Sequence, residues 1–460
     1  MPVSSACSIP CARMGLRLRP TGRRCSRSSA RSGPERPRRG RTTNHVLEFP
    51  MTTDSNRNES NRNISIVLMV LLLFATQACT DIFLSGLPMM AQEFGTTMNV
   101  TNLTISVYNY SQAAVVLFIG VISDVRGRRA TILTCLALHI GATVWIALSS
   151  SISWVIVMRV LQATGSAAVY IILRLIIKDT MDKKAQIHAT GLLVVGLVLS
   201  PILAPVVGAW IIHWSSWRNC FWAIALFEAP LFVWAWMTIR ETNHKQMALR
   251  AAFSLKNHFL SYLGVLQDRY FLGMALIVGS VFAAFYAFIS ISSYLYIQQF
   301  GMRETSYAYV FIGIAVSYLI GNRLMSKLNA DNLTPQRIIG LGISVSLVGA
   351  ACIFGELLTG NRIAVIALIT LGTCLLRLAT ALINPPAQVV VTNHFPDSGS
   401  HALGMLTCIQ YSFAAIGTMV VSGLPLAPSG NFMISTALFV ALSVAGYLFA
   451  FRRGAAVQAS

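Results

Sequence analysis

The sequence predicts an all-α integral membrane protein in which twelve transmembrane helices form two six-helix halves. Hydrophobic residues make up 55% of the 460 residues and charged residues only 11%, whereas a soluble domain carries roughly 25% charged residues. Apolar runs of about 20 residues recur from Ile64 onward, and each is long enough to cross the hydrocarbon core of a bilayer as a helix. The runs are too long and too uniformly apolar for the alternating pattern of a transmembrane β-barrel.

Short polar turns separate these runs, and each run is an expected transmembrane helix. The twelve expected ranges are 64–88, 102–122, 130–149, 152–174, 187–212, 218–239, 270–297, 306–326, 338–358, 362–391, 402–424 and 431–451.

The longest internal loop follows the sixth run and is basic and partly amphipathic. It divides the chain into an N-terminal tail, a first half, a central cytoplasmic loop, a second half and a C-terminal tail, at 1–63, 64–239, 240–269, 270–451 and 452–460. Two six-helix halves joined by a cytoplasmic loop are the plan expected of a transporter built from parallel repeats.

The first fifty residues differ in composition from the rest of the chain. They hold eleven arginines, no lysine and only two acids, Glu35 and Glu48. One interpretation is an Arg- and Ser-rich transit peptide, and the other is that translation starts at Met51. The abrupt change in composition favours Met51. In both cases residues 1–63 are expected to be disordered and outside the fold.

Composition also excludes several function classes. Much of the net charge of +19 lies in the tail, so it does not indicate a nucleic-acid partner. The nine cysteines are scattered without metal-ligand spacing, which predicts no metal site, no disulfide framework and no cofactor. Motifs of metalloproteases, serine hydrolases and phosphate-binding loops are missing and the loops are short, so the chain is not expected to be an enzyme.

Basic residues in the turns predict the orientation in the membrane. The turns on the side of the N-terminal tail carry most of the lysines and arginines, whereas the opposite turns hold only Arg218, Arg303 and Arg362. Because positive charge stays inside, both termini are expected in the cytoplasm of a bacterium, with the chain in its inner membrane.

One charged turn lies between the second and third runs. Asp124 ends one helix, Gly127 allows a tight reversal, and two arginines begin the next helix in the sequence "DVRGRR". This turn resembles the loop 2–3 motif of the major facilitator superfamily.

Further segments carry the same resemblance in chain order. "RVLQATGSAA" from Arg159 resembles the fourth-helix motif of that superfamily, and "SPILAPVVGA" resembles the fifth-helix motif of its drug/proton exporters. Four other segments resemble those of the Bcr/CflA-type drug/proton antiporters, namely "TDIFLSGLP", "RLIIKD", "SWRNCF" and "INPPA". The resemblance covers residues 62 to 451 and implies the major facilitator fold.

The resemblance implies that the charged turn is a conformational latch. Asp124 would meet the start of the eleventh helix near residues 400–402, and Arg126 or Arg128 would pair with Asp179. The residues assigned to this latch are Asp124, Arg126, Gly127, Arg128, Arg129 and Asp179.

Ionisable residues inside the membrane are costly and therefore functional candidates. Asp81 in the first helix is expected to carry the coupling proton, and the resemblance implies that Arg159 in the fourth helix acts beside it. Glu228 in the sixth helix is a second titratable candidate. Capping of a bend by Asp81 and snorkelling of Arg159 to the surface are the structural alternatives. His139 is expected to be a packing histidine.

Two further sets of residues complete the predicted site. Pro201, Pro205 and Gly208 are expected to bend the fifth helix and to allow close approach of the eighth helix. Polar and aromatic residues are expected around a broad substrate cavity, with interhelical hydrogen bonding as the alternative. These cavity residues are Tyr108, Asn109, Gln112, Gln162, Arg377, Asn384, Gln410 and Tyr411, with Arg377 a candidate contact for an anionic group.

The sequence therefore predicts a monomeric, proton-coupled efflux transporter that exports drug-like or metabolite small molecules by alternating access. Its expected partners are the small-molecule substrate, protons and the lipid bilayer. The alternative is a proton-coupled importer of the same fold for a siderophore, peptide or other nutrient.

Overall fold

The computed structural model describes residues 54–243, 255–396 and 398–451. Every regular element within these ranges is helical. The predicted start at Met51 and the C-terminal tail lie outside the described residues. α1 begins at Asp54, ahead of the expected start at residue 64.

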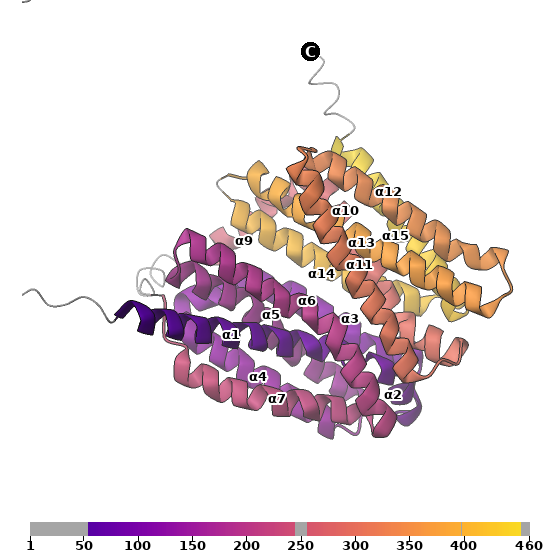
Figure 1. The fold of residues 1–460 in the computed structure, drawn as a ribbon, viewed down its shortest axis with the longest axis horizontal. Helices are drawn as coiled ribbons and strands as arrows, with labels where there is room; N and C mark the ends of the chain where they lie inside the picture. The colour runs from indigo at the N-terminus through magenta and orange to yellow at the C-terminus, as the bar shows by residue number, and fades with distance from the viewer. Residues whose placement is uncertain (1–53, 244–254, 397, 452–460) are drawn as a thin grey trace, which may run out of the picture. The chain divides into compact units, whose positions relative to one another are not determined.

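The first half contains seven α-helices and one short 3-10 helix among the described residues (Figure 1). They are α1 (Asp54–Asp81), η1 (Leu84–Gly86), α2 (Leu87–Glu93), α3 (Met98–Arg126), α4 (Arg128–Leu148), α5 (Ile152–Thr180), α6 (Lys183–Trp214) and α7 (Trp217–Thr238).

The remaining helices are those of the central loop and the second half. They are α9 (Leu255–Leu266), α10 (Arg269–Ser293), the π-helical turn η2 (Tyr294–Gln299), α11 (Glu304–Ala330), α12 (Pro335–Phe354), the 3-10 turn η3 (Gly355–Leu358), α13 (Arg362–His394), α14 (Gly399–Gly423) and α15 (Pro428–Phe451).

Twelve helical segments of the described chain have the length and hydropathy needed to cross a membrane, which confirms the predicted fold class. The first segment, Ile66–Glu93, is not one continuous helix. α1 ends at Asp81, a short 3-10 turn follows, and α2 begins with Pro88 in its first turn. A proline there requires no amide hydrogen bond, so the sequence favours a new helix start at this point. The break places Asp81 at a helix end inside the membrane-spanning segment.

Side chains and glycines mark the other helix ends. Gly127 has a φ angle of 101°, a conformation that other residues rarely adopt, and it separates α3 from α4. The side chains of Asp182, Ser216 and Asp268 accept hydrogen bonds from amides at the starts of α6, α7 and α10. These local signals explain why the predicted boundaries lie close to the observed ones.

Helices of each half pack mainly within that half. In the first half α5 packs against α3 and α4, and in the second half α10 packs against α14 and α15. The two halves meet where α3 packs against α14 and where α6 packs against α11. Figure 1 shows the two groups in indigo to magenta and in orange to yellow.

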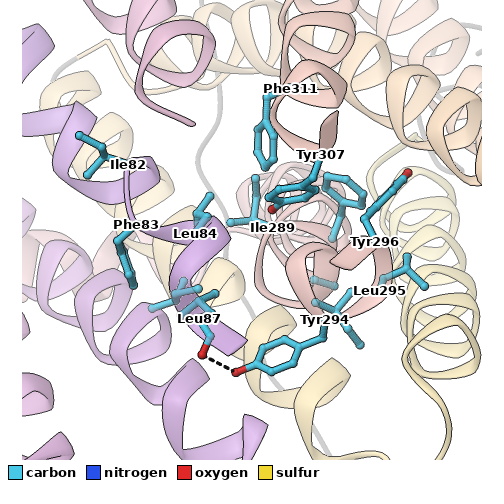
Figure 2. Close-up of a cluster of buried hydrophobic side chains, with 14 of the residues drawn as sticks. Ile82, Phe83, Leu84, Leu87, Ile289, Tyr294, Leu295, Tyr296, Tyr307 and Phe311 are labelled. Carbon is cyan, nitrogen blue, oxygen red and sulfur yellow. Dashed lines mark hydrogen bonds between the residues drawn. The ribbon is translucent and has the colours of Figure 1, made fainter. Parts of the chain in front are cut away.

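The largest apolar cluster includes side chains of both halves. Ile82, Phe83 and Leu87 of the first half belong to the same cluster as Ile289 and Tyr307 of the second half (Figure 2). Two other clusters draw almost wholly on one half each. The halves therefore share a packed core at the end of the bundle that contains α2.

Two hydrogen bonds join the halves at the same end. The hydroxyl group of Tyr294 donates to the carbonyl oxygen of Leu87 over 3.3 Å, as Figure 2 shows. The side-chain amide of Asn102 donates to the hydroxyl group of Ser422 over 2.7 Å, and both residues are buried. Buried polar contacts of this kind fix the register between packed helices.

α9 connects the central loop to both halves. The Tyr262 hydroxyl group donates to the carbonyl oxygen of Leu117 in α3, over 3.1 Å, and the Tyr262 ring contacts the His401 ring in α14. Burial raises the pKa of Tyr262 to about 12, so its phenol remains a hydrogen-bond donor at neutral pH. Residues 244–254 of the predicted loop lie outside the described residues.

Candidate functional site

Arg159 is the central charged residue of the first half. Its side chain is among the largest that are fully buried, with 1% of its surface exposed. The guanidinium carbon lies 4.2 Å from the centre of the Phe83 ring, 4.8 Å from that of Tyr108 and 5.7 Å from that of Phe221. Electron-rich ring faces stabilise a desolvated cation. The alternative that Arg159 reaches the membrane surface is therefore wrong.

Neutral oxygens provide the hydrogen bonds of this guanidinium. Nη1 donates to the side-chain oxygen of Gln162 over 2.6 Å and to the carbonyl oxygen of Cys79 over 3.3 Å. Its Nε and Nη2 atoms have no partner among the described residues. The guanidinium thus keeps its positive charge without a carboxylate in direct contact.

Gln162 connects Arg159 to α4 and α1. Its side-chain nitrogen donates to Thr143 Oγ1 over 2.7 Å and lies 2.8 Å from Cys79 Sγ. Its backbone carbonyl oxygen lies 2.7 Å from Nδ1 of His139. The predicted cavity residue Gln162 is therefore part of a buried hydrogen-bond network.

Asp81 lies beside this network, at the last residue of α1. It is half-buried, and no ion pair or hydrogen bond of its side chain occurs among the described residues. Arg377 exerts the stronger coulombic attraction on its carboxylate and Arg159 the weaker one. Of the three residues predicted for proton coupling, Asp81 thus lies in the electrostatic field of Arg159, together with a further charge from the second half, whereas Glu228 is not among the charges acting on it.

Arg377 lies in the middle of α13 and is half-buried. Its guanidinium carbon lies 4.2 Å from the centre of the Phe285 ring and 4.3 Å from that of Tyr318. Among the described residues it has no ion pair within salt-bridge distance. A cation held between two rings, with Asp81 in range, could attract an anionic group of a ligand.

Glu228 and His139 form a second buried cluster. Oε1 of Glu228 lies 3.2 Å from Nε2 of His139, and neither side chain has any exposed surface. The two residues belong to α7 and α4, whose packing brings them together. His139 is thus a fully buried histidine, as expected of a packing residue, and its Nδ1 atom has a partner in the Gln162 carbonyl oxygen. The sequence gives no local signal for its second neighbour, Glu228, which lies on another helix.

The charged turn between α3 and α4 is organised by Arg128. Its Nη2 atom lies 2.5 Å from the Asp124 carboxylate and its Nε atom 3.0 Å from that of Asp179. Nη1 donates to Ser123 Oγ and, over 3.4 Å, to the carbonyl oxygen of Gly120. The expected link from this turn to Asp179 is confirmed, with Arg128 as the partner.

Asp124 has a different partner from the one expected. Its carboxylate pairs with Arg128, four residues further along the chain, and not with the amides near residues 400–402. The amide of Ala402 instead bonds to the carbonyl oxygen of Ser398 within the first turn of α14. The reason is proximity, since Arg128 lies within one helical turn of Asp124. The remaining latch candidate Arg126 is exposed at the end of α3.

Glu241 completes this turn and has no counterpart in the sequence-based prediction. Its carboxylate accepts hydrogen bonds from the amides of Arg128 and Arg129 over 2.9 and 3.2 Å. It also accepts from the amides of Thr242 and Asn243. Burial alone would raise the pKa of Glu241, but the amide of Asn243 and the other backbone donors hold it below its ordinary value.

Two side-chain contacts add to this connection between the turn and α7. Arg129 Nη2 donates to the backbone carbonyl oxygen of Trp236 over 2.9 Å. The side-chain amide of Asn243 donates to the backbone carbonyl oxygen of Asp124 over 2.9 Å. A carboxylate at the first amides of a helix is the favourable charge arrangement for its N-terminus. The sequence signal for Glu241 was only its position directly after the sixth apolar run.

The fifth transmembrane helix contains the predicted prolines. Pro201 and Pro205 lie inside α6. A Cβ atom at Gly208 would lie 1.6 Å from the carbonyl oxygen of Ile82. Gly208 therefore allows α6 to approach the end of the first helix. The expected approach of the eighth helix is present, since α6 packs against α11, but the close contact of Gly208 itself is with Ile82.

The other predicted cavity residues have different surroundings. Tyr108, Asn109 and Gln112 are buried in α3, and Asn109 donates to the carbonyl oxygen of Ile105 in its own helix. Gln410 is buried, and the Tyr411 ring packs edge-on against Phe282. Asn384 is half-buried, with an unpartnered side-chain oxygen.

Among the residues that the structure describes, no group of three or more His, Cys, Asp or Glu side chains could hold a metal ion. The cysteines Cys79, Cys135 and Cys220 are free and buried. The site can therefore offer a ligand charged groups, aromatic rings and hydrogen-bonding side chains from both halves.

The sequence profile of the Major Facilitator Superfamily matches residues 69–418. The chain belongs to this superfamily. Among curated proteins, it is similar to the multidrug transporter MdfA of Yersinia pestis bv. Antiqua (strain Angola), with 26% identity over 294 residues, covering 64% of this chain and 71% of the relative. It is also 27% identical over 237 residues to the multidrug resistance protein MdtL of Escherichia coli O9:H4 (strain HS), covering 52% of this chain and 59% of the relative.

Solved structures of the superfamily share the fold. A bacterial homolog to the human lysosomal transporter Spinster has a TM-score of 0.65 and 16% identity, covering 87% of this chain and 97% of that one. The D-xylose-proton symporter has a TM-score of 0.64 and 14% identity, covering 84% of this chain and 96% of that one. The protein is accordingly a multi-pass membrane transporter of the major facilitator superfamily, and not an enzyme.

Proposed function

We propose that this transporter exports drug-like or metabolite small molecules in exchange for protons, as a Bcr/CflA-type antiporter of a bacterial inner membrane. Both termini lie in the cytoplasm, and the protein acts as a monomer. The relatives named as multidrug transporters support a drug-like substrate. The basic turns on the side of the termini support the orientation.

The position of Asp81 is the observation that carries the proposal. It is a half-buried carboxyl group at a helix break inside the membrane, in the electrostatic field of Arg377 and, more weakly, of Arg159. Intramembrane acids of this kind are candidates for proton relays. Protonation of Asp81 removes a negative charge between the two halves, and a substrate that interacts with the charged form then competes with the proton.

Alternating access requires contacts that differ between two states. The shared core at the α2 end and the Arg128 cluster lie at different parts of the bundle, and each can stabilise one arrangement of the halves. Exposed ion pairs contribute roughly 0–1 kcal/mol each. A latch needs a bias of only a few kcal/mol between two states. The cluster of Asp124, Arg128 and Asp179 is therefore suited to this role.

Proton release on substrate binding tests the proposal directly. The full chain is purified in detergent, and tetraphenylphosphonium and an uncharged aromatic drug-like compound are added in weakly buffered solution. We expect binding to release protons from the wild type. Asp81→Asn should still bind but release none, because the amide keeps the shape of the side chain and carries no titratable proton. Arg159→Lys should also impair coupling, since lysine lacks the planar guanidinium.

The matched control is Asp331→Asn, which changes an exposed aspartate at the end of α11 and should behave as wild type. Undiminished proton release from Asp81→Asn would contradict the assignment and make Glu228 the first alternative carrier. The importer alternative is tested in inverted membrane vesicles. An exporter accumulates substrate inside them when the interior is acidified, whereas an importer does not.

A further inference from the structure

The pair of Glu228 and His139 is a fully buried titratable pair that the proposed coupling at Asp81 does not use. Both side chains have no exposed surface, and their closest atoms are 3.2 Å apart. The pair lies between α4 and α7, and a Cβ atom at Gly165 of α5 would lie only 2.5 Å from that of His139. Gly165 therefore allows α5 to pack directly against α4 at His139.

The second nitrogen of the imidazole fixes its protonation. Nδ1 of His139 lies 2.7 Å from the carbonyl oxygen of Gln162, which can only accept a hydrogen bond. Nδ1 must therefore carry a proton. Nε2 lies 3.2 Å from Oε1 of Glu228 without the alignment of a hydrogen bond, and neither Glu228 oxygen has a hydrogen-bond partner among the described residues. One further proton makes the pair neutral, either as imidazolium and carboxylate or as imidazole and carboxylic acid. Both arrangements have zero net charge, and removing the proton would leave an unpaired charge in a buried site.

The same histidine reaches Arg159 through Gln162. His139 contacts the backbone oxygen of Gln162. Thr143, one turn further along α4, accepts a hydrogen bond from the side-chain nitrogen of Gln162 over 2.7 Å. Thr143 in turn donates to the carbonyl oxygen of His139 over 2.7 Å. Two points of α4 thus hold Gln162, whose side-chain oxygen accepts from Arg159 over 2.6 Å.

Other titratable groups also face this histidine. They are Cys79 on α1 and Tyr108 on α3, in addition to Glu228 on α7. Arg159 on α5 lies beyond Gln162. Among these groups, His139 and Glu228 are the two whose side chains lie within salt-bridge distance of each other.

We propose that His139 and Glu228 share one proton that stays bound throughout the transport cycle, and that they are positioning residues for Arg159. The inference rests on the proposed coupling at Asp81. The neutral pair holds Gln162 so that the guanidinium remains beside Asp81, and Glu228 contributes to coupling without carrying the transported proton.

Three variants of the full chain test this role. Glu228→Gln supplies an amide that can donate to Nε2, so it imitates the protonated acid. Proton release per bound tetraphenylphosphonium, and its pH midpoint, should stay within about twofold of the wild type. His139→Leu removes the contact to Gln162 and leaves a lone carboxyl group. Coupled accumulation should fall at least about tenfold while binding persists.

The double variant His139→Leu/Glu228→Gln separates folding from positioning. It removes the lone buried carboxyl group, so folded yield should recover relative to His139→Leu. Coupling should remain impaired, because the contact between the imidazole and the Gln162 carbonyl oxygen is still missing and Thr143 alone of the two α4 contacts still holds Gln162. His188→Leu, which changes an exposed histidine in α6, is the matched control.

Two results would overturn the proposal. One is loss of proton release in folded, substrate-binding Glu228→Gln, which would make Glu228 a carrier. The other is wild-type coupling in the double variant, which would show that Arg159 does not depend on the pair.

A spectroscopic measurement decides the proposal even if the wild type releases no protons and the proposed function fails. Nitrogen-15 spectra of His139, assigned by difference from His139→Leu, should show a protonated Nδ1. They should show no titration between about pH 5 and pH 8, the range in which an ordinary histidine titrates. A titration in that range would refute the shared, bound proton.

Discussion

Removing the Glu241 carboxylate should loosen the turn between α3 and α4 by a predictable amount. Two of its four amide partners, those of Arg128 and Arg129, lie in a segment distant along the chain. A hydrogen bond to a charged group contributes roughly 1.5–3 kcal/mol, and half-burial favours the lower part of that range. Glu241→Ala should therefore lower the free energy of local opening by about 2–3 kcal/mol.

Hydrogen exchange of the peptide that contains residues 127–131 measures this opening. Since about 1.4 kcal/mol corresponds to a tenfold change, Glu241→Ala should speed exchange of the Arg128 and Arg129 amides by roughly 30- to 100-fold. Glu241→Gln keeps one acceptor oxygen but loses the charge, and a cost of about 1 kcal/mol gives roughly fivefold faster exchange.

The effect should also depend on pH. Because the folded-state pKa of Glu241 is lowered, its stabilisation is present above the ordinary pKa of about 4.3 and is lost as the pH falls through the folded-state value. The difference between wild type and Glu241→Ala should therefore disappear in strong acid. Glu304→Ala, which changes an acid in the first turn of α11, is the control. Exchange in Glu241→Ala within twofold of wild type at neutral pH would refute this account of the turn.

Three further predictions concern the latch, the helix packing and the energetics. Asp124→Asn should leave the protein inserted but slow turnover, because its pairing with Arg128 weakens; unchanged turnover at equal expression would leave the turn as a topology signal only. Gly208→Ala should strongly reduce folded yield in fluorescence-detected size-exclusion chromatography, whereas Gly191→Ala on the same helix, with nothing within 4 Å of the added carbon, should not. In proteoliposomes, a gradient of one pH unit together with 100 mV should support roughly 500-fold accumulation of an uncharged substrate. The same gradients should support only roughly tenfold accumulation of a monocation, because its charge cancels that of the proton and only the pH difference drives the exchange. Equal dependence of both on membrane potential would contradict one-for-one exchange.

The sequence was sufficient for the helices because the membrane imposes their length. An apolar run that must satisfy its own amides in lipid can only be a helix, so the fourth run, expected at 152–174, agrees with the start of α5 at Ile152. The helix continues to Thr180 because the basic and acidic residues after the apolar run lie beyond the hydrocarbon. Composition therefore predicts starts and ends only to within the polar flanks.

Pairings between distant helices were not predictable in the same way. Gly127 could be anticipated because a short motif fixes its local geometry. The pair with Asp179 was implied by the resemblance to the superfamily, which left Arg126 and Arg128 both open as its partner. The pairing of His139 with Glu228 and the contact of Gly208 with Ile82 depend on which faces of two helices meet. A single sequence does not show which helix faces pack against each other. The break after Asp81 was indicated by Pro88 and by the alternative that Asp81 caps a bend, although the apolar run continues across it.

The unusual surroundings of Arg159 connect this packing to the proposed chemistry. A guanidinium neutralised by a carboxylate in contact would exert little field on a third group, and breaking such a buried pair would be costly. Arg159 is instead stabilised by three ring faces and two neutral oxygens, so its charge remains available to Asp81. The attraction between them then changes whenever Asp81 gains or loses a proton, without a buried ion pair having to break. A coupling site needs this property, because the same carboxyl group has to exist in both protonation states during each cycle.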